Sequence, residues 1–527
     1  MATVSRLSRV RHSVMGTVSS LSRVVIGTVS RLCHVVPLWL IAVMGAASSR
    51  SRVVIGTVSR LSRVVIGTVP RSFRDRDSST HALLFIVCAA SCVPSTSQLR
   101  QPVDAELARR IGAPLVSRDP KLVQALLAEP LDSERAVRIA LANNARVAAA
   151  FDELGIAGGE LASALSLGPL HVDGQLRAAP EGHEYELEVV QNVLGVIAMP
   201  RRRAAARADL AAARANAIAS VLRLAAHVEI AFDDLIAAEH EVELRRTAFD
   251  AADAAATVRE RMYAAGNTTD LAQARDRDAR EQARLDLGRA EAAVETRREA
   301  LDALLGLSGD QTKWTSGATL PLVPETAPSL DDLETAAVAA SLDLTSGRAR
   351  AEAAANRLGA ENLRAFLPEL GLGVSVIWDS RSSAAVGPAI RLGIPLFDQR
   401  SGDRARARAE QQRTDHELIA IAVELRAGAR AARVAALAAY AEARHLRDIV
   451  LPLRQQIVDE TLLHYNAMDA DPFQLIAARR DLAEAGHQYL DAVRRYANAM
   501  AEVTALRRGV QLDPVSARAP RASEVTH

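Results

Sequence analysis

Histidine, cysteine and carboxylate side chains are the residues of this 527-residue chain that could do metal or acid–base chemistry. The histidines after residue 92 are dispersed, and none forms the His-Glu-x-x-His pattern of a zinc peptidase. His171 and His183 could approach each other across one strand hairpin, but a surface position explains them better. No nucleophile is paired with a base in a recognisable pattern. The sequence therefore predicts a protein that is not an enzyme and has no cofactor and no metal site.

Polar side chains also recur at every second position of several short runs, where they would line a wet surface. Leucine, valine and isoleucine fill the positions between them. The polar positions are His171, Asp173, Gln175, Ser375, Asp379 and Arg391. A period of two predicts β-strands with one polar face and one apolar face.

Four such strands are predicted, beginning near Leu170, Glu184, Leu370 and Val386. Their lengths suit the roughly 9 to 11 residues that a tilted strand needs to cross a bilayer. Apolar-out, polar-in alternation is typical of a transmembrane β-barrel, but a small soluble sheet with one wet face alternates in the same way. Four strands cannot close a barrel, since the smallest barrels have about eight. Membrane strands would therefore have to be shared between chains, because an open edge in lipid leaves backbone groups unpaired.

Each strand pair is followed by a very long predicted helix. Apolar residues at alternating steps of four and three predict helices over about 203–263 and 403–465. Each would be about 90 Å long at 1.5 Å per residue. Pro452 lies inside the second long helix and should bend it. Shorter predicted helices, whose paired lengths roughly equal one long helix, span about 133–165, 270–305, 330–366 and 472–508.

The two halves of the chain follow one plan, with landmarks that return about 199 residues later. Leu131-Asp132 is repeated as Leu330-Asp331, and Pro169 before one strand is matched by Pro368 before another. Each copy is a helix, two strands, a long helix, a turn and a helix. The predicted boundaries are 131–305 for the first copy, 306–329 for a linker, 330–508 for the second copy and 509–527 for a disordered tail.

The N-terminal part of the chain is predicted to lie outside this fold. A short unit that begins at Leu21 returns almost unchanged from Leu61, so residues 1–91 are interpreted as low-complexity repeats and a signal segment absent from the mature protein. The apolar run Ala82–Ala90 and the small residues after it fit a bacterial lipoprotein signal that makes Cys92 the lipidated N-terminus. A buried cysteine is the alternative. Residues 92–130 are expected to form an N-terminal linker.

Composition excludes some broad classes of protein. The chain has 64 basic and 63 acidic residues, whereas a nucleic-acid-binding protein would be markedly basic. Its longest uncharged apolar run, 35–47, is too short for the roughly 18 to 20 residues of a membrane-spanning helix. Aromatic residues make up 3%, and alanine fills much of the apolar share, which indicates closely packed helices rather than an aromatic-walled pocket.

Three motifs carry a resemblance to a known family. They are Tyr-Ala-Ala-Gly-Asn-Thr-Thr-Asp-Leu at 263–271, Ile-Pro-Leu-Phe-Asp-Gln at 394–399, and Leu-Pro-Leu-Arg at 451–454 followed by Tyr-Asn-Ala-Met at 465–468. With these motifs in order, the chain from about 131 to 508 resembles the TolC family of outer-membrane efflux proteins. The resemblance implies an α+β membrane protein and a homotrimer. Four strands per chain would join a shared twelve-stranded outer-membrane barrel, and coiled-coil hairpins would form a periplasmic tunnel.

The resemblance also implies a function and partners. The chain would be the exit duct of a tripartite efflux or secretion system, passing small molecules or metal ions from an inner-membrane pump and a periplasmic adaptor to the outside. The polar strand positions would line its pore. The helix-turn-helix tips would dock the adaptor and close the tunnel. Carried onto this sequence, the tip residues are Tyr263, Gly266, Asn267, Thr268, Asp270, Tyr465, Asn466, Asp469 and Asp471.

Two questions stay open at this point. Tip carboxylates could form threefold acidic rings that repel one another and favour cations, or each could cap the helix that follows it. Capping is favoured for Asp270 and neither role is favoured for Asp469 or Asp471. The alternative for the whole chain is a soluble periplasmic coiled-coil adaptor or scaffold, which shares long heptad hairpins but needs no lipid-facing strands.

Overall fold

The computed structural model describes residues 95–112, 120–179, 182–317, 319–366, 369–379, 384–394 and 399–512. The chain divides into two units, Met1–Ala90 and Ser91–His527, and every described residue lies in the second. The predicted repeats and signal segment, the lipidation of Cys92 and the tail beyond residue 512 therefore lie outside the described residues.

Helices dominate the described part, and four strands interrupt them. The first half holds α5 (Thr96–Ile111), α6 (Pro120–Leu127), α7 (Ser133–Asn143), α8 (Ala145–Leu165), α9 (Val193–Ala264) and α10 (Asp270–Leu305). The second half holds the 3-10 turn η2 (Gly309–Thr312), α11 (Leu333–Ala340), α12 (Leu342–Phe366), α13 (Ser401–His445), the π-helical turn η3 (Leu446–Val450), α14 (Leu451–Asn466) and α15 (Pro472–Arg507). The strands are β1 (Leu170–Ala179), β2 (Gly182–Asn192), β3 (Glu369–Asp379) and β4 (Ala385–Gly393).

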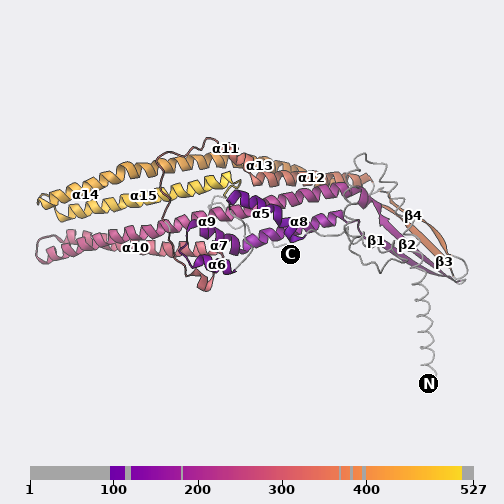
Figure 1. Cartoon of the computed structure of the whole chain (residues 1–527), viewed down its shortest axis with the longest axis horizontal. Helices are drawn as coiled ribbons and strands as arrows, with labels where there is room; N and C mark the ends of the chain where they lie inside the picture. The colour runs from indigo at the N-terminus through magenta and orange to yellow at the C-terminus, as the bar shows by residue number, and fades with distance from the viewer. Residues whose placement is uncertain are drawn as a thin grey trace, which may run out of the picture. The chain divides into compact units, whose positions relative to one another are not determined.

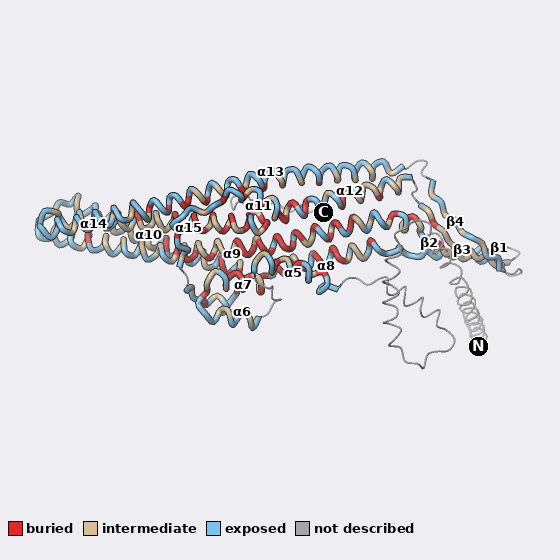
Figure 2. The backbone as a smooth tube through the Cα atoms, turned by 45° about the horizontal axis from the view of Figure 1, so that its top comes forward, coloured by how far each residue is buried: buried red, intermediate tan, exposed pale blue. Residues whose placement is uncertain are grey.

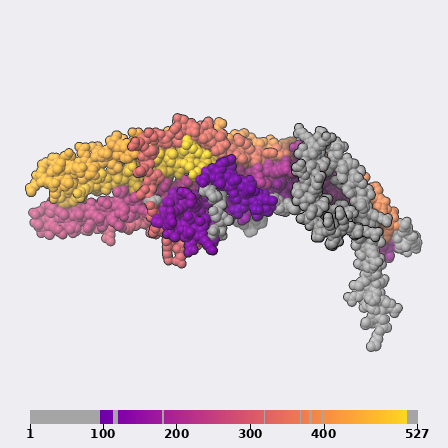
Figure 3. Space-filling view, in the orientation of Figure 1, coloured from indigo at the N-terminus to yellow at the C-terminus, as the bar shows by residue number. Residues whose placement is uncertain are grey.

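The helices form one wall with a fixed side-by-side order (Figure 1). The 72-residue α9 has α8 and then α10 along one flank, and α12 and then α15 along the other. Helices α13 and α14 lie beyond α12 and α15 and contact them rather than α9. The two helical hairpins, α9–α10 and α14–α15, lie next to each other along their length (Figure 3). The shorter helices thus stack end to end beside long ones, as their summed lengths suggest.

The same order continues into the sheet. In the described residues the sheet is antiparallel with strand order β1-β2-β3-β4. Helix α8 leads into β1, β2 runs directly into α9, α12 precedes β3, and β4 precedes α13. The strands therefore have the same neighbours as the helices α8, α9, α12 and α13 to which they connect. The sheet and the helical wall are open on the same two sides. One open edge consists of β1 and α8, and the other consists of β4 and α13.

Two expected helices are each broken once, at positions that correspond in the two copies. The predicted 133–165 helix divides at Asn144, whose side chain accepts a hydrogen bond from the Arg146 amide and so caps α8. The predicted 330–366 helix divides at Ser341, whose hydroxyl accepts from the Leu344 amide. Both side chains satisfy helix N-terminal amides that would otherwise be buried without a partner.

The bend expected at Pro452 takes the form of a π-helical turn at Leu446–Val450, just before the proline. Proline has no amide hydrogen and crowds the carbonyl four residues earlier. We attribute the π-helical turn to the hydrogen bond that proline cannot make. A π turn relieves the crowding between the proline ring and the carbonyl without ending the helix. The helix continues as α14 down to the second tip.

The core is built mainly on α9, where buried residues are red in Figure 2. Large side chains such as Phe232, Leu235 and Ile236 are fully buried there, and many of the other buried residues are alanine. Among the described residues, α9 is also the one helix long and apolar enough by composition to span a membrane, contrary to the expectation that no stretch qualifies. Burial explains its composition, since 61% of that apolar window lies inside the protein.

The segments on either side of the first copy are more ordered than linkers. Helices α5 and α6 occupy the part of 92–130 that the structure describes, and Leu99 and Leu107 of α5 are buried. Between the copies, Trp314 is buried and donates from Nε1 to Asp302 Oδ1 at 2.7 Å. Both segments pack on the helical wall because they supply large apolar side chains to it.

Candidate functional site

The sheet has one polar face, and the register shows which residues share it. His171 pairs with Val190, Asp173 with Glu188 and Gln175 with Glu186. Glu188 pairs in turn with Ser375, and Gly371 pairs with Arg391. Because side chains of paired residues point to the same face, all six predicted pore positions fall on one face. For Asp379 only the backbone placement, opposite Glu184, is described.

A charged cluster crosses this face. Arg391 Nη2 on β4 donates to Asp173 Oδ2 on β1 at 3.0 Å and to Glu188 Oε2 on β2 at 3.4 Å. The sheet is therefore curved enough for side chains of its two edge strands to meet across its polar side. Gly371 and Gly373 permit that curvature, since a Cβ on Gly373 would lie 1.9 Å from the carbonyl oxygen of Val189.

Three glutamates of β2 belong to the polar face but are absent from the predicted pore lining. They are Glu184, Glu186 and Glu188. The sequence could have identified them, because these glutamates alternate with Tyr185 and Leu187 along the strand. With them, the polar face carries more carboxylates than guanidinium groups.

The opposite face is apolar over most of the described strands, with Gln191 toward one end and His183 toward the other. Its residues include Leu170, Val172, Leu176, Leu187, Val189, Leu370, Leu372, Val374, Val376, Val386, Pro388, Ile390 and Leu392. On the edge strands these side chains are exposed, with Ile390 71% and Leu176 64% accessible. Tyr185 and Trp378 stack on this face, with ring centroids 5.6 Å apart. A large exposed apolar surface rimmed by amphipathic aromatic rings is typical of a surface that contacts lipid.

The first tip joins α9 to α10 through a left-handed turn. Gly266 has φ of +73°, its amide bonds the Tyr263 carbonyl, and the Asn267 amide bonds the Met262 carbonyl. This is the Schellman arrangement, in which glycine ends a helix without a steric cost. Thr269 caps α10 by accepting from the Ala272 amide at 3.2 Å.

The expectation that Asp270 is the capping residue is therefore wrong. It is the first residue of α10, where its charge favours the positive end of the helix dipole. Its carboxylate accepts a hydrogen bond from the Tyr263 phenol and raises the pKa of Tyr263. Thr269 is the N-cap instead, because its hydroxyl lies one residue before the helix and reaches the amide of Ala272, the third residue of α10.

The second tip repeats this turn with different residues. Met468 has φ of +60° and 95% exposure, and the amides of Met468 and Asp469 bond the carbonyls of Tyr465 and His464. Asp471 caps α15, accepting from the Phe473 amide at 2.7 Å and the Gln474 amide at 2.9 Å. Asp469 instead lies 2.8 Å from Nδ1 of His464. One of the two undecided carboxylates is thus a cap and the other pairs within its own turn.

Arg259 links the two hairpins near these tips. From α9 it donates to Asp276 of α10 at 2.5 Å and to the Thr268 hydroxyl at 3.2 Å. Its guanidinium carbon also lies 3.4 Å from the ring centroid of Phe473 at the start of α15. A cation over an aromatic face is attracted by the ring's quadrupole, so this one side chain holds both tips together.

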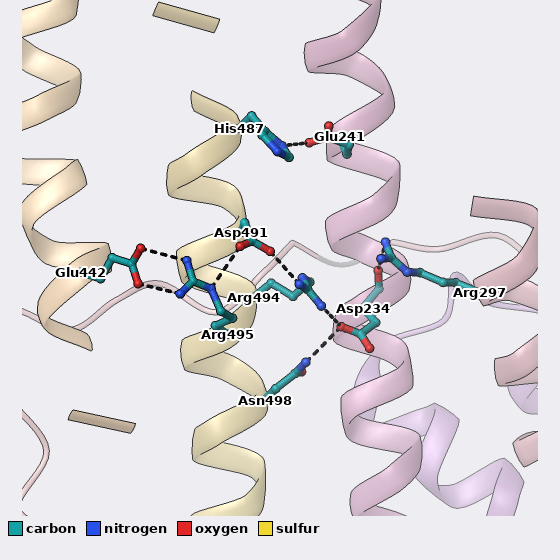
Figure 4. Close-up of polar contacts among 9 residues, drawn as sticks. All are labelled: Asp234, Glu241, Arg297, Glu442, His487, Asp491, Arg494, Arg495 and Asn498. Atoms are coloured by element: carbon teal, nitrogen blue, oxygen red, sulfur yellow. Dashed lines mark hydrogen bonds and ion pairs between the residues drawn. The ribbon is translucent and has the colours of Figure 1, made fainter. Parts of the chain in front are cut away.

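A second set of polar links joins the helices further along the wall (Figure 4). Arg494 of α15 donates to Asp234 of α9 at 3.1 Å and to Asp491 at 2.6 Å. Arg495 reaches Glu442 of α13 through two hydrogen bonds, and His487 of α15 pairs with Glu241 of α9. These ion pairs tie α15 to the helices on both of its sides.

Next to these links lies an acidic group of unusual pKa. Burial, together with the nearby charges of Glu229 and Asp234, raises the pKa of Asp233 to about 6. Asp233 thus titrates within the part of the wall where α9 meets its neighbours. We find no group of three or more histidine, cysteine or acidic residues placed to hold a metal in the part of the chain that is described.

Comparison with known proteins gives one sequence relative and several structural ones. No protein-family model matches the chain. The cobalt-zinc-cadmium resistance protein CzcC of Cupriavidus metallidurans is 26% identical over 298 residues, which are 56% of this chain and 68% of CzcC.

Several solved structures with a similar fold are outer-membrane proteins. The outer membrane protein VceC of Vibrio cholerae has a TM-score of 0.58 at 17% identity, covering 79% of this chain and 99% of VceC. The outer membrane channel CmeC of Campylobacter jejuni has a TM-score of 0.57 at 16% identity, covering 72% and 85%. The outer membrane channel MtrE of Neisseria gonorrhoeae, in its open state, has a TM-score of 0.52 at 20% identity, covering 72% and 90%. These likenesses establish a shared fold.

Proposed function

We propose that the chain is a TolC-family outer membrane factor and that it serves as the outer-membrane exit duct of a tripartite efflux system, as its fold and its sequence relative support. The observation that carries this proposal is the amphipathic sheet, which is open at both edges and continuous with a helical wall open on the same two sides. Lipid requires every backbone group to be paired, so such a sheet can sit in a membrane only as part of a closed ring.

Three copies of the chain are proposed to close that ring. Twelve strands would then form one barrel, with β1 of one copy paired to β4 of the next, and the helical edges would close in the same step. Pro388 on β4 is compatible with this pairing, since proline lacks only the amide donor at its own position. An exposed apolar stripe on α13 and α14, which includes Ile419, Val423 and Val434, supports a neighbour at that edge.

The mechanism is passage rather than catalysis. The polar sheet face is proposed to line a water-filled pore in the outer membrane, with His171, Asp173, Gln175, Ser375, Asp379 and Arg391 facing it. Its surplus of carboxylates would favour cations over anions. The helical wall would extend the duct through the periplasm. No step requires a bound cofactor.

The two tips are proposed as the docking and closing end of the duct. The residues proposed for docking and gating are Tyr263, Gly266, Asn267, Thr268, Asp270, Tyr465, Asn466, Asp469 and Asp471. A periplasmic adaptor and an inner-membrane pump are the proposed partners. Single-channel recordings of a variant with Asp469 and Asp471 replaced by alanine distinguish a gating role of these carboxylates from a helix-capping role. Unchanged closure and unchanged cation preference, with only a frayed α15, would leave these carboxylates a purely structural role.

The cargo is proposed to include divalent metal ions. CzcC is named for resistance to cobalt, zinc and cadmium, and the carboxylates of the polar face suit cationic cargo. We further propose that the working unit is the duplicated pair 131–305 and 330–508 joined by 306–329. A soluble periplasmic adaptor, the alternative to a duct, would have no use for the exposed apolar sheet face.

Membrane extraction tests the duct directly. We expect the full-length protein to be released from the outer-membrane fraction only by detergent and to run as a heat-modifiable trimer. A variant carrying Val172→Asp and Ile390→Asp on the apolar face should lose membrane insertion, whereas Gln175→Asn on the polar face should retain it. Recovery of the unmodified protein as a monomer in the soluble periplasmic fraction would contradict the proposal.

A further inference from the structure

A cavity of about 550 Å³ lies between α9, α12 and α13, outside every site described so far. Its lining is rich in guanidinium groups, which come from all three helices. They belong to Arg202, Arg357, Arg364, Arg400 and Arg406. Small side chains such as Ala205, Ala354 and Ala407 leave room between them. The volume is within the usual range for small-ligand sites, roughly 300 to 1,000 Å³.

The carboxylates around this cavity already have partners. Glu361 accepts from Arg364 at 2.7 Å and lies 3.6 Å from Arg400, which also faces Asp403 at 3.5 Å. Asp209 pairs with Arg357 at 2.5 Å. Three of the five arginines are therefore neutralised within the protein, and their positions are set by these pairs.

None of the carboxylates that the structure describes neutralises the two remaining arginines. Arg202 makes one long contact, 3.5 Å from Nη2 to the Ser163 carbonyl, and no carboxylate in the described part of the chain lies within ion-pair distance of Arg202 or Arg406. Glu410, which also lines the cavity, forms its ion pair with Arg413 at 2.8 Å. Arg202 of α9 and Arg406 of α13 thus bring two positive charges to one cavity. The other three arginines of its lining are held by ion pairs.

We propose that this cavity binds a phosphate-bearing anion. Guanidinium groups present planar pairs of donors that match phosphate oxygens, and two that lack a carboxylate partner, on two different helices, suit a ligand with more than one charged oxygen. A phosphate group offers more acceptor oxygens and carries up to two negative charges, so it can match the charge of both arginines. The same chemistry fits the headgroup of an anionic phospholipid and a free phosphate compound.

Its place in the fold makes a lipid headgroup a reasonable source. Arg364 lies in the last turn of α12 before β3, and Arg400 lies between β4 and the start of α13. The cavity is therefore at the junction where the sheet meets the helical wall. In the proposed duct this is the level of the periplasmic membrane surface, so the lipid source depends on the proposed function, while binding of a free phosphate compound does not.

A matched pair of variants tests the site in the purified full-length protein. The site variant carries Arg202→Gln and Arg406→Gln, which break no ion pair in the described structure. The control carries Arg203→Gln and Arg408→Gln, which remove the same charge from exposed positions on the same helices outside the cavity. Two probes are used, pyrophosphate by titration calorimetry in neutral detergent, and phosphatidylglycerol against phosphatidylcholine in nanodiscs by native mass spectrometry.

We expect one or both anionic probes to bind the unmodified protein and the control alike, and the site variant at least about tenfold more weakly. Binding of pyrophosphate would indicate a soluble phosphate compound as the ligand. Binding of phosphatidylglycerol without binding of pyrophosphate would indicate a lipid headgroup. Equal binding by all three proteins, equal losses in site variant and control, or no binding of either probe would overturn the proposal. If the protein does not insert into membranes but binds pyrophosphate at this cavity, the proposed duct fails and the anion site stands.

Discussion

The two copies of the repeat share a plan but not an environment. In the first copy, the long helix α9 has neighbours on both flanks, and Leu235 on it is fully buried. The residue 199 positions later in the second copy is Val434 on α13, which is 67% exposed because α13 has neighbours on one flank only. The comparison teaches that a duplicated sequence pattern specifies a helix and its apolar stripe, while the position in the wall decides what covers the stripe.

The tips show the same contrast on a smaller scale. Both end a long helix with a residue in the left-handed region, but the first tip uses Gly266 and the second uses Met468. The left-handed region costs an ordinary residue roughly 1 to 2 kcal/mol. The second tip therefore carries strain that the first avoids, and it presents an apolar side chain to solvent.

The largest difference is expected from truncating the matched core positions. Leu235→Ala should lower the free energy of unfolding by about 2 to 5 kcal/mol, because it empties space in a closed core. Val434→Ala should change the stability of the single chain by no more than about 0.5 kcal/mol. Thermal unfolding midpoints measure both, and analytical ultracentrifugation tests whether Val434→Ala weakens the proposed trimer. Equal destabilisation by both changes would show that the edge helix is buried within one chain.

The next difference concerns the caps. Asp471→Ala should destabilise α15 by about 1 to 2 kcal/mol, because the carboxylate accepts from two amides and its charge favours the helix N-terminus. Thr269→Ala should cost about 0.5 to 1 kcal/mol, since one neutral bond is lost. Amide hydrogen exchange in the first turns of α10 and α15 reports these values. A greater loss at Thr269 would reverse the comparison.

Exchanging the left-handed residues should give effects of opposite sign. Gly266→Ala should destabilise the first tip by about 1 kcal/mol. Met468→Gly should stabilise the second tip by less than that, because glycine also increases the entropy of the unfolded chain. Unfolding of each single variant beside the double variant provides the measurement. Destabilisation by Met468→Gly would mean that contacts of the methionine outweigh its backbone strain.

A further expected difference is a pH dependence at one position of α9 that its counterpart in the second copy lacks. Asp233 has a pKa raised to about 6 in the fold, against an ordinary value of 3.8, so the folded state holds its proton more tightly. Stability should therefore fall as pH rises from about 4 to about 6. Asp233→Asn should flatten that slope, whereas the corresponding residue of the second copy, Ala432, cannot titrate. A slope that survives Asp233→Asn would assign it to another group.

Much of the local structure could be predicted from spacing alone. Strand starts, long helices and turns follow from periods of two and of three to four, because these periods are properties of backbone geometry. The left-handed turn at Gly266 was visible, but its equivalent at Met468 was not, since methionine has no preference for that region. Similarly, Asn144 and Ser341 break expected helices because they reach local amides, a choice that depends on where the flanking helices pack.

The candidate site could be predicted only as a set of alternating positions. Alternation placed His171, Asp173 and Gln175 on one face, but not the contact of Arg391 with Asp173, which needs the curvature of four paired strands. The link from Arg259 to Phe473 and the arginine-lined cavity join residues more than 150 positions apart. No local pattern marks such groups, because they become neighbours only when the two copies pack together.

By itself the sequence determined that this chain is a duplicated unit with long heptad helices, two amphipathic strand pairs and two matching tips. Those features depend on short-range geometry, which each segment carries within itself. Tertiary structure alone decided that α9 is interior and α13 is an edge, that the strands take the order of their helices, and that one wall is open on two sides. These follow from packing between distant segments, where buried area and paired backbone groups, rather than any local preference, select the arrangement.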